Sequence, residues 1–188
     1  MPDERMGVSL LRAAKNGNAK NVQMALAHGA DANVSDEAGS TPLMLASGLG
    51  HIDIVRLLIQ GGANVNSTDA AGWTPLLRAA RRGFVAVMQE LLSAGGDIDV
   101  RDPNGWSALL RAARNGHMQA VEYLLAAGTD INGQNEEGNT ALMVACGWGQ
   151  TKVVEALLAA GAEVDIRNSA RHTALMYAAL KGPVDLVW

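Results

Sequence analysis

Apolar residues recur along the chain at helical spacing, in short runs that predict pairs of short helices. Residues 69–101 show it clearly. Leu76, Ala79 and Ala80 follow one another at helical spacing and would form one narrow apolar face. A second run of apolar residues at the same spacing predicts another helix over about 85–94. Two helices this short cannot bury their apolar faces alone, so they need neighbours to pack against.

Turn and capping residues divide these helices from each other. Thr74 is placed to cap the first helix, and Pro75 suits its first position. Gly83 and Gly95 supply the residues that end the two helices. Ile98 is a lone apolar residue in an extended stretch. Each unit is therefore predicted to run turn, short helix, turn, longer helix, loop.

The same unit recurs along the chain with a period of 33 residues and no insertion. The glycine that ends the first helix is found at Gly17, Gly50, Gly83, Gly116, Gly149 and Gly182. The acid or amide that opens each turn is found at Asp36, Asp69, Asp102, Asn135 and Asn168. Such self-similarity predicts a linear array of repeats around no single centre.

Composition and charge narrow the class of protein. The chain has 188 residues, 48% of them hydrophobic and 18% charged, so it has enough apolar residues to fold. Its net charge of -4 makes nucleic acid an unlikely partner. No apolar run is long enough for membrane insertion, and the first residues do not form a secretory signal. With Cys146 as its single cysteine, the chain is expected in the cytoplasm or nucleus.

The second unit carries a specific family motif. Its motif residues are Asp36, Gly39, Thr41-Pro42-Leu43, Ala46, Gly50-His51, Ile54-Val55, Leu57-Leu58, Gly62-Ala63 and Val65-Asn66. On these residues the chain resembles the ankyrin repeat family. The resemblance implies an all-α solenoid of stacked helix-turn-helix units joined by β-turn or hairpin loops. We expect one domain, 1–188, with repeats at about 3–35, 36–68, 69–101, 102–134 and 135–167 and a partial repeat at 168–188.

The chain also departs from the family pattern. The family's T-P-L-H histidine is replaced by Leu11, Met44, Leu77, Leu110, Met143 and Met176. We therefore expect apolar packing where the family forms histidine hydrogen bonds. Met6 and Arg171 occupy the position of the turn glycine, so the first turn is expected not to form.

Signatures of catalysis are missing from the sequence. The four histidines lie in different repeats, and His51 and His117 fill the family's Gly-His position, where a structural role is expected. Cys146 takes a position that holds alanine or serine elsewhere, which indicates a buried small residue. We predict neither an enzyme nor a metal or cofactor site.

Three tryptophans occupy positions where other repeats accept residues such as Ser, Asn or Leu. Trp73 and Trp106 follow the turn glycine, and Trp148 ends a first helix. In the family, the position after the turn glycine faces the concave groove and is variable. Asn139 and His172 hold it in the last two repeats. The alternative is that the rings only cover neighbouring turns.

Arginines repeat on the first helices at spacings that place them on one face. Arg78 and Arg111 are expected to pair with turn acids such as Asp69, Asp102, Glu136 and Glu137. Three other arginines, nearer the helix ends, are expected to be exposed: Arg81, Arg82 and Arg114. The predicted partner-binding set is therefore Trp73, Arg78, Arg81, Arg82, Trp106, Arg111, Arg114, Asn139, Trp148 and His172.

The leading hypothesis is a protein-interaction module whose groove over repeats 3–5 binds an acidic or aromatic segment of another protein. A second is a site for a small ligand or nucleotide, with Trp73 and Trp106 stacking on a base and arginines on phosphates. A third is an engineered ankyrin scaffold. The end of the sequence inside a predicted helix, at 186–188, also suggests a piece of a longer chain.

Ankyrin repeats are substrates of an asparaginyl hydroxylase that prefers a leucine eight residues before the target and an acidic-aliphatic pair just before it. Leu124 and Asp130-Ile131 place Asn132 in this context, and Asn66 fits less well. The alternative is that Asn132 only holds its loop together.

Overall fold

The computed structural model describes residues 2–180, with side chains from Arg5 onward. The sequence predictions for Gly182 and residues 186–188 lie outside the described residues. The helices in the described part are α1 (Pro2–Lys15), α2 (Ala19–Ala27), α3 (Pro42–Leu49), α4 (Ile52–Gln60), α5 (Pro75–Arg82), α6 (Val85–Ser93), α7 (Ala108–Arg114), α8 (Met118–Ala126), α9 (Ala141–Trp148), α10 (Thr151–Ala159) and α11 (Ala174–Leu180). Residues 2–180 hold no strand beyond one isolated bridge, Arg101 with Ser107. The predicted all-α repeat fold is confirmed.

The predicted caps begin the first helices of the repeats. Thr41, Ser107 and Thr140 are N-caps whose hydroxyls each accept a hydrogen bond at 3.3 Å from the backbone N–H three residues on. Thr74 does the same for Leu77 at 3.2 Å. The hydroxyl satisfies a backbone donor that the helix itself leaves unpaired.

The turn between repeats is built around the acid or amide that opens each unit. In the second repeat, Asp36 Oδ1 accepts the backbone N–H of Ser40 at 2.8 Å, and Gly39 N–H donates to the Asp36 carbonyl at 2.9 Å. Gly39 has φ 78°, a left-handed conformation that glycine adopts without strain. In the last repeat Arg171 takes the same position with φ 63°, so this turn forms without glycine.

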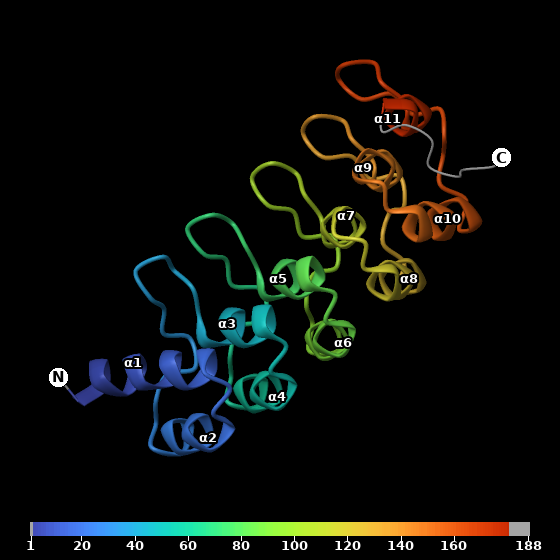
Figure 1. Ribbon diagram of the computed structural model, residues 1–188. Coiled ribbons are helices and arrows are strands. Elements are labelled where there is room, and N and C mark those ends of the chain that lie inside the picture. The colour runs from blue at the N-terminus through green and yellow to red at the C-terminus, as the bar shows by residue number, and fades with distance from the viewer. Residues whose placement is uncertain (1, 181–188) are drawn as a thin grey trace. The chain divides into compact units, whose positions relative to one another are not determined.

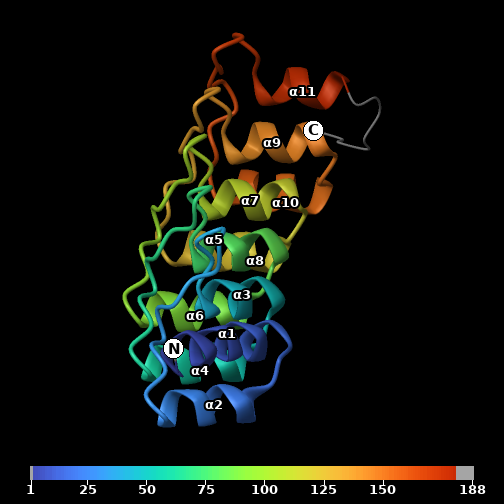
Figure 2. The same ribbon diagram turned by 90° about the vertical axis from the view of Figure 1, so that its left-hand side faces the viewer.

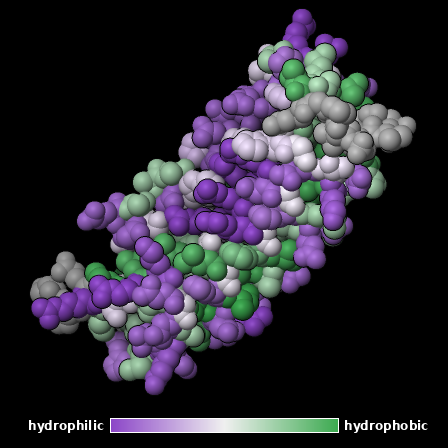
Figure 3. All heavy atoms as spheres, in the orientation of Figure 1, coloured by the Kyte–Doolittle hydropathy of each residue, from purple (hydrophilic) through white to green (hydrophobic). Residues whose placement is uncertain are grey.

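The first compact unit comprises Met1–Ala79 and Phe84–Asp97. Within it, α1 packs on α2 and α3, α3 on α4, and α4 on α2 and α6 (Figure 1). Buried apolar residues such as Leu10, Met44 and Leu58 form its core. Leu49 of α3 is exposed. Figure 3 shows an area of hydrophobic residues on the surface of this unit. Its first turn is absent, as expected, because α1 continues through Met6.

The second compact unit comprises Ala80–Gly83 and Ile98–Trp188. Within it, α7 packs on α8 and α9, and α9 packs on α10 and α11. Its core includes Leu110, Leu124 and Leu157. Inside this unit, the loops before α9 and α11 project to one side of the helices (Figure 2). The first helices of the repeats in this unit therefore form one common face next to these loops.

Apolar side chains replace the family's histidine in the interior. Met44, Leu77, Leu110 and Met143 are all buried at this position, as expected. Met176 of α11 is exposed.

Asparagine side chains join successive loops within each unit. Asn33 Nδ2 donates to the Gly62 carbonyl at 3.1 Å, and its Oδ1 accepts the Asn64 N–H at 2.7 Å. Asn66 repeats this pattern with Gly95 and Asp97. The polar ends of these loops are thus satisfied without a sheet. Among residues 2–180, no helix is long and apolar enough to cross a membrane.

Candidate functional site

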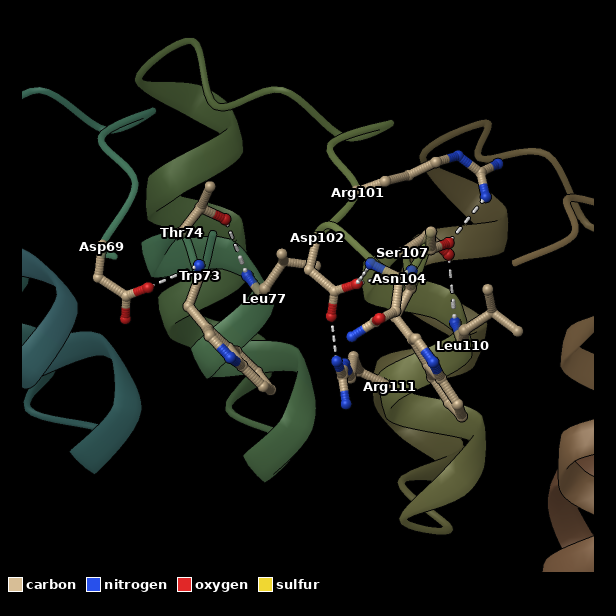
Figure 4. Close-up of polar contacts among 12 residues, drawn as sticks. Asp69, Trp73, Thr74, Leu77, Arg101, Asp102, Asn104, Ser107, Leu110 and Arg111 are labelled. Carbon is tan, nitrogen blue, oxygen red and sulfur yellow. Dashed lines mark hydrogen bonds and ion pairs between the residues drawn. The ribbon is translucent and has the colours of Figure 1, made fainter. Parts of the chain in front are cut away.

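Two arginines are held by the acids that open their own repeats. Arg78 pairs with Asp69 at 2.5 Å and donates to Ser40 Oγ at 2.8 Å. Arg111 pairs with Asp102 in the same way, and Figure 4 shows the two side chains pointing toward each other. The predicted pairing is confirmed, so both cations are neutralised inside the protein.

The pKa of the Asp69 carboxyl is lowered by its surroundings in the turn. Burial by itself would raise the pKa of Asp69. Hydrogen bonds from Arg78 and from the backbone N–H groups of Trp73 and Ala71, together with the Arg78 charge, outweigh burial and hold the pKa below its ordinary value of 3.8. The ionised form is therefore part of the folded structure.

Tryptophan follows each of these two turns. The Trp73 N–H donates to Asp69 Oδ1 at 2.9 Å, and the Trp106 N–H donates to Asp102 Oδ1 at 3.0 Å. Both residues are half-buried. Trp73 belongs to the first unit and Trp106 to the second.

Arg114 lies against two tryptophan rings in the second unit. Its guanidinium carbon is 5.5 Å from the ring centroid of Trp106 and 4.5 Å from that of Trp148. The guanidinium carbon of Arg111 also lies 4.8 Å from the Trp106 ring centroid. These are cation–π distances. The expectation that Arg114 is exposed is wrong: it is half-buried because the two rings cover it. Trp148 remains 54% exposed.

A pocket of about 500 Å³ opens beside this stack. We name it the Arg114 pocket. It is lined by Trp106, Arg114, Glu137, Asn139, Met143, Val144, Gly147, Trp148 and Tyr177. All of these residues belong to the second unit.

Asn139 lies at the pocket with its polar atoms already engaged. It is buried, and its Nδ2 donates to Glu137 Oε2 at 2.8 Å. Its Oδ1 accepts from Asn168 Nδ2 at 2.7 Å and from the Tyr177 hydroxyl at 3.3 Å. His172 is exposed, and its ring meets the Tyr177 ring edge to face at 5.7 Å. The structure gives both predicted binding residues a role in holding the last turn.

Arg81 and Arg82 are exposed, as predicted. The backbone carbonyl of Arg81 lies 3.0 Å from His117 Nε2, so this histidine joins two repeats. Its expected structural role is confirmed.

Cys146 is buried in α9, as its position among small residues predicted. Burial raises the pKa of its thiol to about 11. The thiol is therefore protonated at neutral pH, and reactivity requires the thiolate.

Sequence reasoning missed Glu137 and Tyr177 as residues of the site. The signal was present in the repeat register, since Tyr177 takes the position of Arg78 and Arg111. The register does not predict that a tyrosine at this position contacts Asn139 and helps to line a pocket.

A family model of ankyrin repeats matches the chain in three copies, over residues 10–102, 85–168 and 127–188. The chain belongs to the ankyrin repeat family. A comparison with curated proteins gave no match.

Proposed function

We propose that this protein binds a segment of another protein at the surface formed by Trp106, Arg114 and Trp148. Ankyrin repeats generally mediate protein–protein interaction, which supports the class of function. The particular surface and the chemistry of the partner are our proposal.

The observation that carries it is the stack of Arg114 on two tryptophan rings. Folding does not require these residues: Ser40 replaces Trp106 in the second repeat, and Leu49 replaces Trp148. Tryptophan and arginine dominate binding hot spots because they offer a large contact area with few rotatable bonds. A stacked arginine is already ordered, so less entropy is lost on binding.

Local charge favours an acidic partner segment despite the net charge of -4. Arg114 faces the pocket, and exposed Arg81 and Arg82 belong to the same compact unit. Exposed cations speed encounter with acidic segments, and this effect is lost as salt screens their charge.

The experiment is affinity capture with the intact chain, its Trp106→Ala/Trp148→Ala variant and a control Lys152→Gln variant. Lys152 is exposed in α10 of the same unit, outside the pocket lining. We expect proteins that bind the parent and the control to be lost from the tryptophan variant. Retention of every captured protein by a folded tryptophan variant would contradict the proposed surface.

The nucleotide alternative finds less support. The pocket has room for a small ligand and offers rings, but Arg114 is the one cation in its lining and the Glu137 carboxylate lies there too, so the several negative charges of a nucleotide's phosphates would stay uncompensated. Titration with ATP separates the two functions: a nucleotide site would quench tryptophan fluorescence at micromolar concentrations, and we expect no such change.

A further inference from the structure

The Arg114 pocket exists because the fifth repeat lacks two arginines that its predecessors carry. Val144 stands at the position of Arg78 and Arg111. Gly147 stands at the position of Arg81 and Arg114. Both small residues line the pocket.

The turn residue of the fifth repeat changes with them. Asp69 and Asp102 pair with an arginine nine residues on, whereas Asn135 has Val144 at that distance. Asn135 Oδ1 accepts the Asn139 N–H at 2.8 Å, as the aspartates do for their tryptophans. Its Nδ2 therefore takes the place of the carboxylate oxygen that meets arginine. A neutral amide suits an uncharged neighbour, because a buried carboxylate without a cationic partner would destabilise the fold.

Two side chains of this unit have hydrogen-bond donors without an acceptor among the described residues. Asn135 is 6% exposed, and its Nδ2 has no hydrogen-bond partner. The Arg114 side chain contacts two rings and makes no hydrogen bond or ion pair with any other described residue. The one carboxylate of the pocket, Glu137, is engaged by Asn139. The N–H groups of the Arg114 guanidinium therefore remain available to an acceptor.

We propose that the Arg114 pocket receives the carboxylate of an aspartate or glutamate side chain of the partner. The proposal rests on the function proposed above and names the group that the site recognises. The carboxylate accepts two parallel N–H bonds from Arg114, while the rest of the acidic residue packs on the exposed Trp148 ring. An incoming lysine or arginine fits less well, because it would meet the Arg114 charge, and the Glu137 carboxylate is already engaged by Asn139.

The test uses a randomised peptide library displayed on phage, selected on the intact chain. We expect enriched peptides to share one aspartate or glutamate. Synthetic versions of an enriched peptide, with that residue and with its amide counterpart, are then titrated against the protein by fluorescence polarisation. The acidic form should bind on the order of tenfold more tightly, the usual value of a charge-assisted pair.

Two protein variants test whether the Arg114 pocket is where the acidic peptide binds. Arg114→Gln removes the charge and should weaken the acidic peptide by about tenfold. Asn135→Asp/Val144→Arg rebuilds the ion pair of repeats 3 and 4, so it fills the pocket without changing the net charge. Its thermal unfolding should match the parent, and it should also lose the acidic peptide. Lys152→Gln, which removes a charge elsewhere, should bind within about twofold of the parent.

The outcomes separate the two proposals. Peptides without an acidic residue, basic peptides, or acidic peptides that bind all four proteins equally would overturn the carboxylate site and leave peptide binding intact. A library with no enriched peptide would overturn the proposed function as well. If the double variant unfolds below the parent, the Arg114→Gln and amide-peptide comparisons still decide.

Discussion

The carboxylate of Asp102 pairs with the guanidinium of Arg111, nine residues further along the chain. The two side chains are only 2% and 11% exposed. The same carboxylate accepts the Trp106 N–H, so one residue closes the turn, anchors it to α7 and positions the tryptophan. Asp69 and Arg78 form the corresponding pair with Trp73. These pairs join the turn to the helix face that carries the candidate site.

Replacing Asp69 by asparagine tests the charge in this arrangement. The folded state holds the Asp69 pKa below its ordinary value, so the ionised carboxylate contributes stability above pH 4 that is lost as pH falls through the folded pKa. We expect Asp69→Asn to lower the free energy of unfolding by about 1–2 kcal/mol at pH 7. The difference from the parent should shrink below pH 4, as measured by urea unfolding. Asp36→Asn is the control, because Asp36 is exposed and has Leu45 nine residues on; equal losses in both variants would contradict the role of the arginine.

Arg171→Gly should stabilise the protein. Arg171 has φ 63°, and a residue with a side chain is strained there by about 1–2 kcal/mol. Glycine relieves that strain but is more flexible when unfolded, so we expect a net gain of about 0.5–1 kcal/mol and a small rise in Tm. Ala170→Gly, one residue earlier without a left-handed backbone, should lower Tm; a drop in both variants would contradict the assignment of strain.

Asn132→Ala should loosen the loop at the end of the fourth repeat. Asn132 Nδ2 donates to Glu163 Oε1 and its Oδ1 accepts the Glu163 N–H, both at 3.0 Å. We expect the free energy of unfolding to fall by about 1 kcal/mol and hydrogen exchange at Glu163 to become faster, with Asn104→Ala on an exposed turn as the control.

Hydroxylation at Asn132 or Asn66 stays a prediction. Intact mass after incubation with an asparaginyl hydroxylase tests it, and an unshifted mass would contradict it.

Cys146 should make the folded protein sensitive to alkali. Burial raises the pKa of its thiol to about 11 from the ordinary value of 9.0. Between these values the thiol ionises only in the unfolded chain, so the stability that is complete below pH 9 falls as pH rises toward 11. Cys146→Ala, which copies Ala113 of the preceding repeat, should lose less stability between pH 7 and pH 10 than the parent does. Identical losses would show that the thiol is not the cause.

Much of the candidate site could be predicted from the repeat register. Trp106 and Trp148 stood out because other repeats fill their positions with residues such as Ser, Asn or Leu, and Arg114 stood out because arginines recur on the first helices. The pairing of Arg111 with Asp102 followed from charge and proximity along the chain. The burial of Arg114 did not follow, because it depends on where two rings from different helices meet. The pocket could not be predicted either. It depends on the absence of arginine at positions 144 and 147 as much as on the side chains that line it.

The sequence by itself determined the repeat, its helices and its turns. These depend on local chemistry: threonine caps, glycines with positive φ and apolar residues at helical spacing all act within a few residues of each other. Only the tertiary structure decided which polar groups find partners. Asp102 finds Arg111, whereas Asn135 Nδ2 and the Arg114 side chain find no acceptor among the described residues. Hydrogen bonding depends on distances of about 3 Å between side chains far apart in the sequence, and only the packing of one repeat on the next sets those distances.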